Sequence, residues 1–332
     1  MQQNSEGFQS GSEELTLVPV LNWYEWDLLL SASEQKSVFL LSSYLHTSEL
    51  LPAARYLVAK NKILGGIVIP ELYPEALSSP IRSYSTYQSV WFISEVTSGF
   101  RKSQNQSDIL SRLGRILLNN NIDLHLSLHW SIKDVRGLDW AFFNSPKRKI
   151  QFTPKYTGIL DLTKFRDFQE YLKTVSSGRK ADFRLSNSLH VEQVSDSSAV
   201  SLFMMMYEET IPFADIESKT KALTHVEHLV RDSMGIGTGT LWFAKNHNGQ
   251  VLSGVFIQKI GDILYYQFGA SHKNELKVSP NAVTLLHVIE NAFETNITSF
   301  DFVGMNSPKR GAFKASLNPE TRLYFEVLIQ SI

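Results

Sequence analysis

Hydrophobic and polar positions follow two different periods along this chain, which predicts a mixed α/β protein. Apolar residues recur every three or four positions, as on one face of a helix, in the segments 107–117, 199–209, 219–234 and 280–293. Short apolar or alternating runs predict strands at 63–69, 122–130, 241–245, 251–259, 263–270, 298–303 and 323–329. Turn dipeptides separate the three strands from 241 to 270, so these strands should form an antiparallel meander.

Two helices have starts that the sequence marks. Thr163 is a capping residue ahead of an apolar stripe that runs to Ser176. Ser279 precedes Pro280, the order of a cap followed by proline at the first helical position. We therefore expect helices over 163–176 and from 280 onward.

A five-residue string occurs twice. Asn-Ser-Pro-Lys-Arg stands at 144–148 and again at 306–310, and each copy follows an apolar-Asp-aromatic step that contains Asp139 or Asp301. Self-similarity at about half the chain length indicates a duplicated lobe. We place the boundary near Pro154, which gives a disordered leader at 1–14, a first lobe at 15–154 and a second lobe at 155–332. The sequence leaves open whether the last strand crosses back to complete the first lobe.

The composition narrows the possible functions. The chain has 332 residues, a 43% hydrophobic content and a formal net charge of -1, so it can bury two cores and carries no overall field that would attract DNA. It has no cysteine, which excludes disulfides, thiolate metal sites and a cysteine nucleophile. The longest apolar runs are strand-sized, and the polar first residues do not form a signal peptide. We expect a cytoplasmic protein without membrane insertion, of open oligomeric state.

Four segments carry a resemblance to a known family. They are 179–184, with its basic residues, 265–270, 279–281, and 300–304 followed by the Phe313-Lys314 pair. Together with the order of helices and strands, these segments indicate that residues 156–326 resemble GNAT acyltransferases. The resemblance is more specifically to the Fem-type peptidyltransferases and their two-lobed relatives. The resemblance implies an α/β (α+β) fold of tandem GNAT-like lobes, each a mixed, mostly antiparallel central sheet flanked by helices. The first lobe matches only loosely and would be non-catalytic.

The family pattern is incomplete in two places. GNAT acetyltransferases carry a glycine-rich loop that cradles the pyrophosphate of coenzyme A before the helix from Pro280, whereas segment 273–279 has no glycine. The long coiled-coil insertion of some Fem-type proteins is also absent, because no heptad run of that length exists. Conventional coenzyme A binding is therefore in doubt.

The resemblance assigns roles to residues of the second lobe. Two neighbouring strands would splay apart and expose backbone amides to a donor carbonyl, with the helix from Pro280 directing its N–H groups at an anionic donor tail. The implied catalytic residues are Lys314, Tyr266 and Asp301. The implied donor-binding residues are Ser279, Pro280, Asn281, Arg310 and Phe313, and the acceptor-binding residues are Arg179 and Arg184.

Each assignment has a plainer alternative. Lys314 alone is a solvated surface lysine, Tyr266 a core aromatic, and Arg179 and Arg184 the exposed face of a helix. For Asp301 we favour a structural role. A buried carboxylate without a partner is costly, so Asp301 would be locked to a neighbour such as Lys309 or Arg310. Two histidine pairs, His125 with His129 and His225 with His228, lack a third ligand at the spacing of a metal site, so no metal is expected.

The implied function is an N-acyltransferase that moves an acyl group from an activated donor to an amine of a small-molecule or cell-envelope precursor, by direct attack in a ternary complex. No cofactor would be tightly bound, and acyl-CoA is the favoured co-substrate. An aminoacyl-tRNA donor is the enzymatic alternative, not favoured because the chain shows no obvious RNA-binding arm. A GNAT-shaped binding protein without turnover is the alternative of another class.

Overall fold

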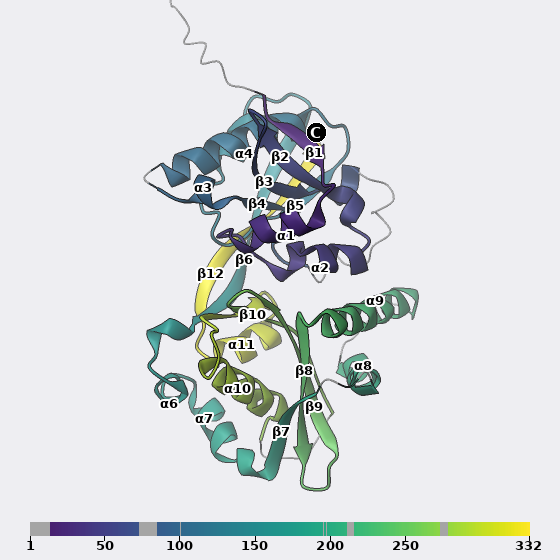
Figure 1. Ribbon diagram of the computed structural model, residues 1–332, viewed down its shortest axis with the longest axis vertical. Helices are drawn as coiled ribbons and strands as arrows, with labels where there is room; N and C mark the ends of the chain where they lie inside the picture. The colour runs from purple at the N-terminus through teal and green to yellow at the C-terminus, as the bar shows by residue number, and fades with distance from the viewer. Residues whose placement is uncertain are drawn as a thin grey trace, which may run out of the picture.

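The computed structural model describes residues 14–72, 85–99, 101–194, 196, 198–210, 216–272 and 278–332. Figure 1 shows two lobes joined by the long strands β6 and β12. The leader up to residue 13 and the segment 273–277, which holds most of the glycine-free stretch, lie outside the described residues.

The described helices surround two sheets. The strands are β1 (Thr16–Pro19), β2 (Ala54–Ala59), β3 (Lys62–Val68), β4 (Val90–Phe92), β5 (Leu124–Ser127), β6 (Arg148–Asp161), β7 (Leu189–Val194), β8 (Gly239–Asn246), β9 (Val251–Ile260), β10 (Ile263–Ser271), β11 (Ser299–Gly304) and β12 (Glu320–Ser331). The helices are α1 (Trp23–Ser31), α2 (Ser42–Thr47), α3 (Ser94–Thr97), α4 (Lys102–Leu118), α5 (Arg136–Phe142), α6 (Phe168–Leu172), α7 (Ser177–Arg184), α8 (Ser198–Thr210), α9 (Ile216–Ile236), α10 (Pro280–Phe293) and α11 (Pro308–Ala315). Short 3-10 turns include η1 (Val38–Leu40) and η6 (Leu162–Lys164).

Two of the predicted elements differ from the observed ones. The strand expected at 122–130 is only β5, because the chain turns at His129, whose carbonyl oxygen accepts the Ile132 N–H at 2.9 Å. The helix expected over 163–176 is broken into η6 and α6, because Asp167 is extended and its side chain caps α6 by accepting the Glu170 N–H at 2.8 Å.

The strands form one sheet of four and one of eight. Their orders are β1-β2-β3-β4 and β5-β12-β6-β11-β10-β9-β8-β7. Of the ladders between the described strands, β10 with β11 is parallel and the others are antiparallel. The predicted meander corresponds to β8, β9 and β10. The structure also confirms the predicted fold class of two lobes with mixed, mostly antiparallel sheets.

The strands β6 and β12 form a ribbon that belongs to both lobes. They pair antiparallel from Arg148 opposite Ser331 to Ile159 opposite Glu320, and the far end of β12 also pairs with β5 of the first lobe. The last strand therefore crosses back into the first lobe, as Figure 1 shows. The boundary placed near Pro154 falls inside β6, which continues through it without a break.

The duplicated string does not mark equivalent positions of the two lobes. Its first copy follows helix α5 and leads into β6, whereas its second copy precedes helix α11. Helices α5 and α11 begin at 136 and 308, and strands β6 and β12 begin at 148 and 320, so the lobes correspond at a separation of 172 positions. Asp139 lies on a helix and Asp301 in a strand, so the inference that they occupy the same place is wrong.

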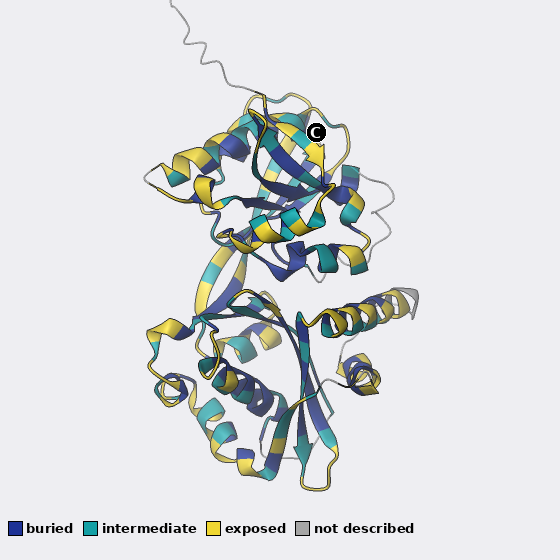
Figure 2. Cartoon of the chain, in the orientation of Figure 1, coloured by how far each residue is buried: buried dark blue, intermediate teal, exposed yellow. Residues whose placement is uncertain are grey.

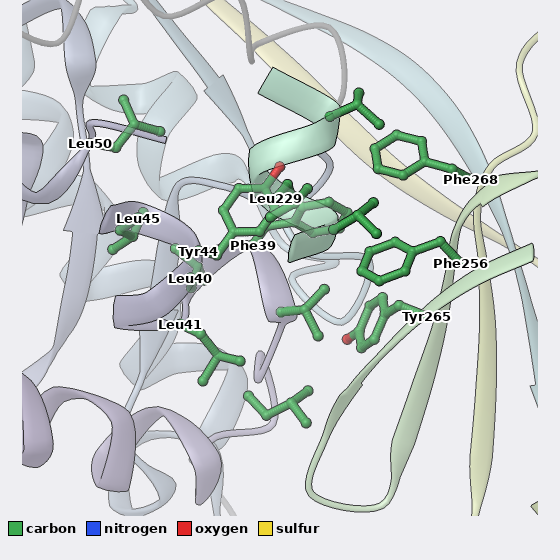
Figure 3. Packing of buried hydrophobic residues seen from close by; sticks show 14 of the residues in the cluster. Phe39, Leu40, Leu41, Tyr44, Leu45, Leu50, Leu229, Phe256, Tyr265 and Phe268 are labelled. Atoms are coloured by element: carbon green, nitrogen blue, oxygen red, sulfur yellow. The ribbon is translucent and has the colours of Figure 1, made fainter. Parts of the chain in front are cut away.

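One cluster of buried apolar residues is shared by the two lobes. Phe39 and Tyr44 of the first lobe lie in one cluster of buried residues with Phe256 and Phe268 of the second. The rings of Phe39 and Tyr265 meet edge to face, with centroids 6.1 Å apart. Figure 3 shows these side chains converging from the two lobes, and Figure 2 shows the exposed residues along the outer helices. The relative position of the lobes is therefore fixed by packing.

Replacing Phe39 by alanine should weaken this shared core. The ring is fully buried, so Phe39→Ala should lower the free energy of unfolding by about 3–5 kcal/mol in urea titrations. Phe143→Ala is the matched control, because that ring is 80% exposed in the same lobe and its loss should change stability by less than about 0.5 kcal/mol. Equal effects of the two substitutions would contradict a core shared by both lobes.

Candidate active site

Strands β10 and β11 begin as parallel neighbours and then separate. Their register runs from Ile263 opposite Ser299 to Tyr265 opposite Asp301, and no later pair joins them although both strands are described in full. Beyond this point β10 continues along β9, and β11 continues along β6. The facing edges are left without a ladder between them, which is the wedge expected of a GNAT-like lobe.

A bend at Val303 turns β11 away from β10. Val303 has a φ of 57°, in the left-handed region, which costs a β-branched residue about 1–2 kcal/mol. The Asp301 carboxylate accepts the Val303 N–H at 2.6 Å. The Lys314 ammonium donates to the carbonyl oxygens of Val303 and Gly304, at 3.4 and 2.9 Å. Two charged side chains therefore stabilise the bend that opens the wedge.

Helix α11 packs closely enough to bring Lys314 back to this bend. At Gly311, a Cβ atom would lie 2.4 Å from the carbonyl oxygen of Met305, so a larger residue would push the helix away. The half-buried Lys314 ammonium also lies 5.6 Å from the centre of the Tyr266 ring, a cation–π distance.

A cavity of about 520 Å³ occupies the mouth of the wedge. Its lining residues are Ser85, Thr86, Lys155, Tyr207, Thr210, Tyr266, Gln267, Phe268, Gly269, Asn281, Val303, Gly304, Asn306, Ser307, Lys309, Arg310, Phe313, Lys314, Tyr324 and Glu326. Four of these described residues are cationic and one, Glu326, is acidic, so the cavity favours an anionic ligand.

Burial shifts the protonation of both charged groups at the bend. Asp301 is 1% exposed, and desolvation raises the pKa of its carboxyl to about 6, against the opposing effects of the Val303 N–H, Thr157 and Lys314. Desolvation also lowers the pKa of Lys314 to about 8, which Asp301 partly reverses and Arg310 reinforces. Both groups can therefore change charge near neutral pH.

Tyr266 is held in place at the edge of the cavity. Its hydroxyl accepts a hydrogen bond from the Asn281 amide at 3.2 Å, and burial raises the pKa of Tyr266 above the ordinary value. A Cβ atom at Gly269 would lie 2.1 Å from this hydroxyl. Strand β10 therefore needs glycine there for Tyr266 to reach helix α10.

The N-terminus of helix α10 is occupied by a carboxylate of the chain itself. The Ser279 N–H donates to Asp182 of α7 at 2.8 Å, and neither Ser279 nor Pro280 lines the cavity. Asp182 is also 2.9 Å from Arg179, whose guanidinium lies 5.5 Å from the Phe313 ring centre. The helix end predicted to receive the donor's anion thus carries Asp182.

The structure gathers some of the predicted site residues and separates others. Tyr266, Asn281, Arg310, Phe313 and Lys314 line the cavity, and Asp301 lies buried behind Lys314. Arg179 and Arg184 do not line this cavity, and Arg184 lines a separate one of about 710 Å³ beside α6, α7 and α10. The predicted lock of Asp301 onto Lys309 or Arg310 is wrong, because its carboxylate bonds to Val303 and Thr157.

Sequence reasoning missed the residues that the ribbon brings to the cavity. Tyr324 of β12 lies opposite Lys155 of β6, and Lys155 is 3.3 Å from Glu326. Asn306 lies in the second copy of the duplicated string, where its side chain accepts the Tyr156 N–H at 2.8 Å. Only the pairing of two strands far apart in the chain could reveal these positions.

The corresponding strands of the first lobe, β4 and β5, are bridged by side chains. The Ser127 N–H donates to the Ser89 hydroxyl at 2.6 Å, and the Tyr87 N–H donates to the Ser127 hydroxyl at 3.1 Å. These bonds connect the facing segments of the first lobe at the place where the second lobe has its cavity.

The described parts of the chain show neither a metal-binding cluster nor a membrane-spanning helix. Within those parts, no three His, Asp or Glu side chains are grouped so as to hold a metal ion. Among the described helices, none combines the length and apolar character needed to span a bilayer.

The fold and the site are similar to those of tandem GNAT-like proteins. Residues 170–314 match the family model of the acetyltransferase (GNAT) domain. The second lobe is therefore similar to a GNAT domain, and the chain as a whole is similar in fold to two-lobed GNAT-like proteins.

Three solved structures illustrate the likeness of the fold. FemX is 12% identical over 94% of this chain and 96% of its own, with a TM-score of 0.64. A conserved protein of unknown function from Bacteroides thetaiotaomicron is 11% identical over 95% and 99%, with a TM-score of 0.53. A tandem GNAT protein from the clavulanic acid biosynthesis pathway is 10% identical over 96% and 98%, with a TM-score of 0.50. No curated protein matches significantly in sequence.

Two substitutions at Val303 should reveal the strain in the bend. Val303→Gly and Val303→Ala both remove the side chain, but only glycine adopts a positive φ without penalty. At an ordinary position alanine is the more stable by about 0.5–1 kcal/mol. Here Val303→Gly should be the more stable of the two by about 1 kcal/mol in urea unfolding. The opposite order would show that the bend is unstrained.

Proposed function

We propose that this protein is an N-acyltransferase that transfers an acyl group from a phosphate-bearing activated donor to the amine of a small-molecule or cell-envelope precursor. The observation that carries the proposal is the wedge between β10 and β11, which opens onto a cationic cavity. The match of residues 170–314 to the GNAT domain supports a transferase.

The proposed reaction is a direct attack within a ternary complex. The acceptor's neutral amine attacks the donor carbonyl, a C–N bond forms, and the C–S bond of a thioester, or the C–O bond of an ester, breaks. The amine proton passes to the leaving thiolate or alkoxide, directly or through solvent. Backbone N–H groups on the strand edges that no ladder joins, with the Lys314 ammonium behind them, would stabilise the negative charge that develops on the carbonyl oxygen.

The charges of the cavity suggest how the two substrates are divided. Lys309 and Arg310 have no ion pair among the described residues, and both line the cavity beside Lys314, so they suit the donor's phosphates. Glu326, the acidic residue of the described lining, lies 3.3 Å from Lys155, and the ammonium form of the acceptor would replace Lys155 as its partner before the acceptor loses its proton. Ser279 and Pro280 have no part in this arrangement.

Acyl-CoA is the first donor to test, and aminoacyl-tRNA is the second candidate. The specific observation in favour of the second is Asp182, whose carboxylate bonds to the Ser279 N–H at the helix end that was predicted to face the donor's anionic tail. A donor whose phosphates reach only Lys309 and Arg310 avoids that carboxylate. If neither donor reacts, the conclusion is that the chain is a GNAT-shaped binding protein without turnover.

Removing the Lys314 ammonium should slow transfer. The chain is offered radiolabelled acyl-CoAs and charged tRNAs with a panel of amines, and Lys314→Met should reduce kcat/KM by on the order of tenfold or more. Lys149→Met is the matched control, because Lys149 is exposed on β6 and outside the cavity lining. Equal turnover by both variants would exclude the role of Lys314, and failure of every donor would exclude the catalytic function.

Anion binding beside Lys314 should weaken at alkaline pH. The pKa of Lys314 is about 8 in the free protein, so the ammonium is present below that pH and is lost above it. The affinity for ADP, whose own charge is constant over this range, should fall by up to about tenfold per pH unit above pH 8. Calorimetric titration measures it, and Lys314→Met should bind weakly with no such dependence. A pH-independent affinity in the parent protein would contradict the placement of the anion.

A further inference from the structure

A loop of the first lobe reaches into the catalytic lobe next to the cavity. Ser85 and Thr86 line the cavity, and Tyr87 follows them with its side chain fully buried. Tyr87 has a φ of 62°, a strained conformation for a bulky residue. Its N–H is held by the Ser127 hydroxyl at 3.1 Å. Such strain persists only where the surroundings determine the conformation.

The Tyr87 ring is fixed by aromatic neighbours from both lobes. Its centroid lies 5.0 Å from that of His129 and 6.3 Å from that of Phe39, both in the first lobe. It also lies 5.2 Å from the ring of Tyr324, which lines the cavity. Edge-to-face packing on several sides leaves the ring little freedom, so the direction of its hydroxyl is set by the fold.

Two buried polar atoms are left without partners where this ring ends. The Tyr87 hydroxyl faces Thr157 and Asp301. Among the described residues, neither this hydroxyl nor Asp301 Oδ2 has a hydrogen bond of good geometry, although both atoms are inaccessible to solvent. Each such atom costs about 1–3 kcal/mol if it stays unpaired. A hydroxyl donor and a carboxylate acceptor are chemically matched to satisfy each other.

We infer that the Tyr87 hydroxyl and Asp301 Oδ2 form a hydrogen-bonded pair between the lobes, directly or through one water molecule, and that Tyr87 is a positioning residue for the catalytic lobe. The inference rests on the proposed function only for its effect on turnover. Asp301 Oδ1 holds the strained Val303 N–H, so the pair would fix both oxygens of the carboxylate. The first lobe thereby orients the bend that carries Lys314.

Other ionisable groups face Asp301 from the elements around it. They are Lys314 on α11, Tyr265 on β10 and Tyr324 on β12. Lys314 favours the carboxylate form of Asp301. Burial is the main cause that raises the pKa of Tyr87, Tyr265 and Tyr324, and the negative charge of Asp301 raises it further. The tyrosines stay protonated near neutral pH, so the titration close to pH 6 belongs to Asp301.

The test follows the carboxyl group of Asp301 itself. The full chain is labelled with carbon-13 at its aspartates, and the Asp301 resonance is the one that disappears in Asp301→Asn. In the parent protein it should titrate near pH 6. Tyr87→Phe removes a donor to the carboxylate and should raise this midpoint by about half a unit or more. Tyr56→Phe is the control, since that hydroxyl bonds to the Asn22 carbonyl oxygen and should leave the midpoint unchanged.

A reciprocal measurement covers the case in which Tyr87→Phe does not fold. The Tyr87 ring carbon that bears the hydroxyl should change its chemical shift as the parent protein is titrated through pH 6, and should not do so in Asp301→Asn. An Asp301 midpoint unmoved by Tyr87→Phe, or a Tyr87 resonance insensitive to Asp301, would overturn the pair. Both readouts are independent of turnover, so the absence of catalysis would leave them valid.

Where turnover is found, Tyr87→Phe should alter kcat and leave KM for the donor unchanged, because Tyr87 does not line the cavity. The pH at which kcat changes should move in the same direction as the Asp301 midpoint. A rise in KM with kcat unchanged would contradict a positioning role, because it would mean that Tyr87 only shapes the binding surface.

Discussion

The left-handed bend at Val303 is the constraint on which the site depends. Without it, β11 would continue beside β10 in the parallel register that begins at Ile263 and Ser299, and the wedge would close. The bend is unfavourable in itself, and it is stabilised by the Asp301 carboxylate and the Lys314 ammonium. Asp301 and Lys314 are also the charged groups at the wedge itself. A structural role for these two residues therefore does not exclude a functional one.

The two lobes act as one body because their core and their longest strands are shared. The ribbon of β6 and β12 runs from one lobe into the other, and the cluster around Phe39 holds residues of both. The cavity lies where these features meet, with lining residues from the first-lobe loop at Ser85, from the ribbon and from the wedge. The first lobe therefore contributes to the cavity that lies beside the strands of the second.

The sequence predicts the fold well where the signal is local. Periodicity places the meander, helices α8, α9 and α10 and strand β11 close to their observed bounds, and the Phe313-Lys314 pair leads to the residue at the bend. It fails where the cause is tertiary. Asn306 and Asn144 stand in identical strings, yet Asn306, which bonds to the neighbouring strand β6, lines the cavity and Asn144 does not. Tyr324 and Lys155 are brought together only by strand pairing, and no local pattern encodes it.

The start of helix α10 shows why a sound physical rule can lead to the wrong ligand. Unpaired N–H groups at a helix start attract an anion, and the rule does not specify whether that anion is a substrate or a side chain. Here the carboxylate of Asp182 bonds to the Ser279 N–H, and Arg179 holds that carboxylate. The cations of the cavity beside this helix, among them Lys309 and Arg310, are side chains. Flexible cationic side chains accept an anion in several geometries, whereas a glycine-rich loop presents its backbone N–H groups in one, so the two kinds of anion site differ in selectivity.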